Sequence, residues 1–175
     1  MQIKTNTRLI NAILLSIFSL AILSVNFNVS AEEKTFLTTR VLSAKLALQA
    51  ATAAYDDCSK KGYQVSAAVV DRSGALLAFI RNPLSGAHTI KVSQRKAYSA
   101  ATYQTPTSEM MDREPFRFTP GVLLLGGALP IRVAGHFYGA IAVSGAPPRK
   151  VPGDIDDECS QVGLDTITEI LEFAD

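Results

Sequence analysis

The chain has 175 residues, with 17 lysines and arginines against 16 aspartates and glutamates and a formal net charge of +1 at neutral pH. This balance argues against nucleic acid as the main partner, because binding to a phosphate backbone favours a strongly basic surface. The length is sufficient for one domain whose hydrophobic core needs no structural metal.

The first 31 residues have the pattern of an export signal. Two basic residues precede an apolar run at residues 9–25, and Val29-Ser30-Ala31 is a small-residue cleavage site. A membrane anchor is the alternative, but polar residues follow the run and a basic stop-transfer cluster does not. We therefore predict a signal peptide at residues 1–31 and one exported, periplasmic domain at residues 32–175. After the signal is removed this domain does not span a membrane, and with two positive charges lost its net charge is −1.

A helix and a strand pair are expected after the signal. Alanine and leucine fill residues 39–61, with Thr39 as a candidate cap and Gly62 in the position that favours a left-handed helix end. Residues 63–71 and 75–81 have the composition of two strands, and the residues between them have turn chemistry.

A second helix and an irregular segment are expected next. Thr89 is placed to cap a helix at residues 90–103, whose inward-facing residues are small. Ser108 is a candidate cap for a short helix, and Pro115 and Pro120 bound an irregular loop.

The most apolar stretch of the domain, residues 122–145, predicts two adjacent strands joined by a tight turn at Gly135-His136. Gly126 and Gly127 mark a close approach to the backbone, made either by a crowded turn or by a bound ligand. A last helix is expected from Asp154, which would cap it. The fold class is therefore α+β, with a mainly antiparallel sheet and helices packed on it.

Cys58 and Cys159 are the only cysteines. Each lies on the core-facing side of a predicted helix, and export permits oxidation. We predict a disulfide that stabilises the fold by roughly 4–5 kcal/mol. The alternative is two buried free thiols that act as small apolar groups. The spacing disfavours a thioredoxin-like site and covalent c-type haem.

Few residues suggest chemistry. His88 lies at a helix N-terminus, where the dipole favours a neutral imidazole that can bind a metal, whereas His136 is expected to be exposed at a hairpin tip. Ser144 lies outside a nucleophile elbow, and no zinc-protease, Walker A or Rossmann motif is present. The residues alone therefore do not predict a catalytic site. Basic residues that can pair with an anionic ligand gather around the second strand pair and second helix: Arg72, Arg81, Lys91, Arg95 and Lys96.

Six sequence blocks carry a resemblance. In chain order they are VVDRSGALLAF (69–79), GAHT (86–89), SQRKAYSA (93–100), GGALPI (126–131), GAIAVSG (139–145) and DDEC (156–159). They resemble the GlcG/HbpS family of haem-binding proteins, in order and over nearly the whole predicted mature chain. Ala142 stands where the family usually has a glycine.

The resemblance implies a compact α+β domain, with a central, mainly antiparallel sheet of about five strands and flanking helices in a two-layer, PAS- or profilin-like sandwich. It also implies assembly into a homo-oligomer and binding of haem or a related tetrapyrrole. On this basis His88 is predicted to ligate the iron, Arg95 or Lys96 to meet the propionates, and Gly126 and Gly127 to contact the ligand. Three other roles remain open: a haem-degrading or glycolate-pathway enzyme, a corrinoid-binding module, and a sensor that acts on a membrane partner.

Overall fold

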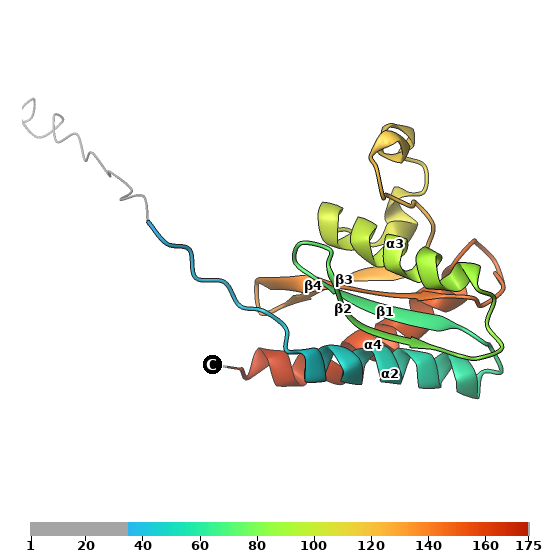
Figure 1. Cartoon of the computed structure of the whole chain (residues 1–175), viewed down its shortest axis with the longest axis horizontal. Coiled ribbons are helices and arrows are strands. Elements are labelled where there is room, and N and C mark those ends of the chain that lie inside the picture. The colour runs from blue at the N-terminus through green and yellow to red at the C-terminus, as the bar shows by residue number, and fades with distance from the viewer. Residues whose placement is uncertain (1–34, 175) are drawn as a thin grey trace, which may run out of the picture. The chain divides into compact units, whose positions relative to one another are not determined.

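A computed structural model describes residues 35–174 (Figure 1). The chain divides into two units, Met1–Thr38 and Thr39–Asp175, and the fold described here is that of the second unit. The predicted signal peptide lies outside the described residues, as does Asp175. No helix among the described residues has the length and apolar character needed to cross a membrane.

One antiparallel sheet of four strands organises the domain. Its strands are β1 (Ser66–Asp71), β2 (Leu76–Arg81), β3 (Ala128–Val133) and β4 (His136–Ser144), in the spatial order β2-β1-β4-β3. Strands β1 and β2 form one hairpin, β3 and β4 form another, and the β1–β4 pairing joins the two hairpins at the centre. The sequence predicted these four strands; the fifth that the resemblance implied is absent from the described residues.

Helices cover both faces of this sheet, so the domain has three layers rather than the two expected (Figure 1). Helix α3 (His88–Tyr103) lies on one face, and α2 (Ala44–Lys60) and α4 (Asp154–Glu172) lie side by side on the other. The α+β class is confirmed. Because both faces of the sheet are covered, every β4 residue after His136 is buried, and most of these residues are apolar.

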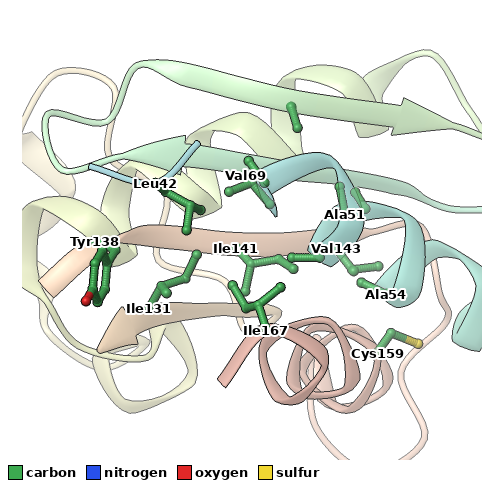
Figure 2. Close-up of a cluster of buried hydrophobic side chains, with 14 of the residues drawn as sticks. Leu42, Ala51, Ala54, Val69, Ile131, Tyr138, Ile141, Val143, Cys159 and Ile167 are labelled. Carbon is green, nitrogen blue, oxygen red and sulfur yellow. The ribbon is translucent and has the colours of Figure 1, made fainter. Parts of the chain in front are cut away.

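The larger core lies between the sheet and the helices α2 and α4. Strand β4 contributes Ile141 and Val143, β3 contributes Ile131, and α4 contributes Ile167, as Figure 2 shows. Helix α2 faces this core with alanines, which bring its backbone close to the sheet and to α4.

The smaller core lies between the sheet and α3. Its members are mostly alanines: Ala97, Ala100 and Ala101 of the helix face Ala140 and Ala142 of β4. The small residues predicted for this helix face therefore allow a close helix–sheet approach.

The structure also corrects the expected helix ends. Helix α2 begins at Ala44 rather than residue 39, because Ser43 is extended and its hydroxyl accepts a hydrogen bond from the Leu46 N–H at 3.2 Å. Helix α3 begins at His88, so Thr89 is inside the helix and does not cap it. Gly153, with φ of +88°, occupies the N-cap position of α4 that was expected for Asp154.

Strand β3 begins at Ala128, later than the residue 122 expected from the sequence. Two short 3₁₀ helices, η2 (Thr107–Met110) and η3 (Glu114–Phe118), precede a segment without regular secondary structure at residues 122–127. This segment was expected to belong to the hairpin. Its last residue still bonds to β4, because the Val143 N–H donates to the Gly127 carbonyl at 2.9 Å, but the Leu123 N–H donates to the Ser99 hydroxyl of α3 at 2.8 Å.

The predicted disulfide is present. Cys58 of α2 and Cys159 of α4 are bonded and fully buried, and they lie 101 residues apart in the sequence. A tight turn is present at the tip of the second hairpin, but Ala134 and Gly135 form it, with φ of 48° and 77°, rather than Gly135 and His136. His136 is the first residue of β4, pairs with Val133 and is exposed.

Candidate functional site

A cleft of about 260 Å³ lies at the N-terminal end of α3 and contains His88. The opposite wall comes from the end of β4 and from the loop and first turn that begin α4. The lining residues are His88, Val92, Lys96, Leu125, Ser144, Gly145, Ala146, Pro148, Pro152, Gly153 and Asp156. Four separate sequence blocks of the resemblance, at residues 86–89, 93–100, 139–145 and 156–159, therefore meet around one hollow.

His88 is exposed, and its ring lies over Gly86. A Cβ atom added to Gly86 would stand only 2.6 Å from the imidazole Cε1 and 2.7 Å from Nδ1. The ring therefore occupies space that any other residue at position 86 would take. Within residues 35–174 no three histidine, cysteine or acidic side chains converge to hold a metal ion, so His88 is a single candidate donor.

Lys96 forms the deep end of the cleft and is fully buried. Its ammonium group donates to Asp156 Oδ2 at 2.8 Å and to the Val143 carbonyl at 3.1 Å. Burial raises the pKa of the Asp156 carboxyl, and the Lys96 charge opposes that rise. Contact between Lys96 and a propionate would require this ion pair to open, and it stays a prediction.

Gly126 and Gly127 are crowded by the start of α4. A Cβ atom on Gly127 would meet the Lys96 Nζ and the Asp156 Cβ, each at 2.6 Å, and its φ is +117°. A Cβ atom on Gly126 would meet the Pro152 carbonyl oxygen at 2.7 Å. Here the close approach to both glycines is made by the protein itself, which is the first of the two explanations considered from the sequence. Ligand contact at these glycines stays a prediction.

Asp157 completes this crowded junction. Its Oδ1 accepts a hydrogen bond from the Gly127 N–H at 2.7 Å. Burial raises the pKa of the Asp157 carboxyl, and the bond from Gly127 opposes the rise. The Ser160 hydroxyl donates to the Gly127 carbonyl at 2.9 Å. The first part of α4 thus binds both the N–H and the carbonyl of Gly127.

Arg95 lies on the exposed side of α3 and holds the following loop. Its Nε donates to the Gly121 carbonyl at 3.2 Å and its Nη2 to the Val122 carbonyl at 2.8 Å. The guanidinium has further N–H groups, so these bonds leave donors for an anionic ligand.

A second hollow, of about 400 Å³, is lined by Arg117 and residues 122–125. Leu125 lines both hollows, so they adjoin at this residue. A wider hollow of about 640 Å³ between η2 and α4 contains none of the predicted site residues.

Two parts of the site were missed from the sequence. The apolar wall at residues 122–125 was assigned to a strand, and nothing in its composition marks it as a cleft wall. Asp156 appeared in the sequence analysis only as part of the DDEC block of the resemblance, and no role in the site was predicted for it. A fully buried lysine needs a nearby carboxylate, but the sequence alone did not indicate that Lys96 is buried.

Comparisons with known proteins identify the family of the chain. A family model described as "Haem degrading protein HbpS-like" matches residues 42–165. The chain belongs to this family. Protein GlcG of Escherichia coli strain K12 is 34% identical over 109 residues, which cover 59% of this chain and 81% of GlcG.

Solved structures of similar fold include other members and a haem complex. The crystal structure of HbpS is 33% identical, with a TM-score of 0.71 over 79% of this chain and 99% of HbpS. The PduOC:Heme complex has a TM-score of 0.65 over 73% of this chain and 96% of PduOC. At 20% identity the second comparison shows the common HbpS-like fold alone.

Proposed function

We propose that this protein binds haem or a closely related tetrapyrrole in the cleft at the N-terminal end of α3. The observation that carries the proposal is the exposed His88 imidazole at a cleft whose wall continues, past Leu125, along an apolar segment. Membership of the HbpS-like family supports the choice of ligand.

The residues present fit such a ligand by their chemistry. A tetrapyrrole needs a donor to its metal, an apolar surface against the ring faces, and cations for its propionates. His88 supplies the donor, Val92 and Leu125 supply apolar surface, and the exposed Arg95 supplies unused guanidinium donors. A pocket for a small molecule commonly measures about 300–1,000 Å³, so the 260 Å³ cleft needs the adjoining hollow.

Each residue then has a defined task. His88 binds the iron, residues 122–125 exclude water from one side of the ligand, and Arg95 orients the propionates while it holds this loop. Bound haem would supply redox and gas-binding chemistry at its iron. The Lys96–Asp156 pair keeps the end of β4 and the start of α4 together behind the cleft.

A hemin titration of residues 32–175, followed by Soret absorbance, tests the proposal, with a cobalamin titration beside it. We expect a saturable, red-shifted band at a fixed stoichiometry. His88→Ala should remove or shift the band, while His136→Ala, which changes the other histidine at the exposed hairpin tip, should leave it unchanged. An unaltered band in His88→Ala would overturn the ligand assignment. Absence of binding by the folded wild-type protein would overturn haem as ligand, and saturable cobalamin binding would then favour a corrinoid.

The same titration separates a binding protein from an enzyme. With a haem-degrading enzyme, the Soret band would disappear over time when a reductant is added in the presence of O2, which is the oxidant that opens the ring, and a linear tetrapyrrole would be released. A binding protein would retain the band apart from its reduction shift.

We also propose that the domain is exported to the periplasm, forms a homo-oligomer and serves in haem sensing, storage or uptake, with a membrane sensor as its partner if it acts in sensing. The signal pattern and the buried disulfide support export, because disulfides persist in oxidising compartments. Cell fractionation should recover a periplasmic protein that begins at Glu32, and light scattering should give the mass of several subunits. A cytoplasmic protein that retains residue 1, or a monomer, would contradict the respective proposal.

A further inference from the structure

A chain of buried hydroxyl groups lies directly behind His88. The Thr89 Oγ1 is 2.8 Å from the Ser66 Oγ and 2.7 Å from the Ser85 Oγ, and it donates to the Gly86 carbonyl at 2.7 Å. All three hydroxyl residues are at most 4% exposed. One hydroxyl therefore joins strand β1, the loop before α3 and the first turn of the helix.

This network determines where the His88 backbone lies. Thr89 follows His88 directly, and its hydroxyl holds the Gly86 carbonyl, so residues 86–89 form a turn closed on itself. The Thr89 N–H also donates to the Gly86 carbonyl, at 3.0 Å. Because Ser66 belongs to a central strand of the sheet, the turn is held against a rigid part of the fold.

Gly86 contributes to the direction of the imidazole ring. The ring rests where a side chain at position 86 would lie, with 2.6 Å between its Cε1 and an added Cβ. The φ angle of Gly86 is outside the positive region that favours glycine. An alanine there would therefore not strain the backbone, and its main effect would be to displace the ring.

We infer that Gly86 and Thr89 are positioning residues for His88: Thr89 fixes the turn that carries the histidine, and Gly86 leaves the space in which the imidazole lies. The inference rests on the proposed function, in which His88 binds the metal of a tetrapyrrole. Groups that orient a metal ligand commonly change affinity by about 10–100-fold when they are removed.

The competing explanation is that the hydroxyl network only stabilises the start of α3. The two explanations differ in what happens to the His88 ring. A stabilising network would leave the ring position and the spectrum of the bound ligand unchanged in any variant that still folds.

The experiment compares Thr89→Val, Thr89→Ser and Gly86→Ala with the wild-type protein. Valine has the shape of threonine but removes the hydroxyl, whereas serine retains it. The first readout is NMR of the ring protons without ligand, which is simple because His88 and His136 are the only histidines. We expect a nuclear Overhauser contact between the His88 ring and Gly86 in the wild type, its loss in Thr89→Val, and its return in Thr89→Ser.

The second readout is hemin affinity and the Soret maximum. We expect Thr89→Val and Gly86→Ala to bind hemin at least about tenfold more weakly, with a shifted band, and Thr89→Ser to bind like the wild type. The inference is wrong if the ring contact is missing from the wild type, or if Thr89→Val keeps both the contact and the wild-type band. If hemin does not bind but the ring contact depends on the Thr89 hydroxyl, the proposed function fails and the positioning role stands.

Discussion

The ammonium group of Lys96 lies 2.8 Å from Asp156 Oδ2, and both side chains are buried, at 0% and 5% exposed. The pair joins α3 on one face of the sheet to α4 on the other, past the end of β4. Asp156 Oδ1 also accepts a hydrogen bond from the Ala146 N–H at 3.1 Å. The two charges therefore connect all three layers of the domain at the deep end of the cleft.

Removing one member of this pair should lower the free energy of unfolding. Lys96→Met leaves the Asp156 carboxylate buried without its cation, for which we expect a loss of about 3–5 kcal/mol in the free energy of unfolding. Lys91→Met, which changes an exposed lysine of the same helix, should have an effect of less than about 0.5 kcal/mol. Urea unfolding followed by circular dichroism measures both.

The double variant Lys96→Met/Asp156→Leu tests the explanation. Because it removes both charges, it should recover a substantial part of the stability lost in Lys96→Met. If the double variant is less stable than Lys96→Met by the full cost of a second independent change, the two residues do not act as a pair.

The amount of structure that the sequence predicted differs between elements for physical reasons. Strand pairs such as residues 63–71 and 75–81 are marked by their own composition and turn residues, and they were predicted to within a few residues. The disulfide followed from two cysteines on core-facing helix stripes. The third layer and the residue at which the second hairpin begins depend on contacts between distant segments. One such contact is the hydrogen bond from the Leu123 N–H to the Ser99 hydroxyl, which leaves no local sequence pattern.

The candidate site shows the same limit. His88 was found because its residue type and place at a helix start suggest a metal donor. The resemblance led to the assignment of Lys96 to a ligand. A lysine on a helix is normally exposed, and the sequence does not reveal that α3 packs against an alanine-rich sheet face. The charge of Lys96 is paired with a residue 60 positions away.

Two glycines of positive φ offer a matched comparison. Gly135→Ala changes a hairpin residue whose added Cβ meets nothing within 4 Å, so only backbone strain of about 1–2 kcal/mol is expected. Gly127→Ala adds to such strain contacts below 3 Å with Lys96, Asp156 and the Val143 carbonyl. We expect a loss of at least about 3 kcal/mol, or failure to fold, because strain and overpacking add. Thermal unfolding measures the difference, and equal losses in the two variants would refute the crowding seen at Gly127.

The disulfide should account for a large share of the stability. A bridge across 101 residues is expected to contribute about 4–5 kcal/mol by restricting the unfolded chain. The variant Cys58→Ala/Cys159→Ala should therefore unfold at a much lower guanidinium concentration than the oxidised wild type. Reductant should bring the wild type down to the same midpoint and leave the variant unaffected. A variant as stable as the oxidised wild type would contradict this prediction.

Asp154 should give the protein a dependence on acid pH. Its carboxylate accepts hydrogen bonds from the backbone N–H groups of Arg149 at 3.0 Å, Lys150 at 2.7 Å and Ile155 at 2.9 Å. These bonds, that from Arg149 first, lower the pKa of Asp154 from 3.8 to about 2. A carboxyl whose pKa is lower in the folded state stabilises the fold above its unfolded pKa and loses that contribution as pH falls through the folded value.

We therefore expect Asp154→Asn to be less stable than the wild type at pH 6, and the difference to shrink between about pH 4 and pH 2. Asp112→Asn, at an exposed position, is the control and should show no such change. Unfolding midpoints measured across this range for the three proteins give the result, because groups common to all of them cancel in the differences. A difference between wild type and Asp154→Asn that stays constant down to pH 2 would show that the charge of Asp154 does not hold the loop before α4.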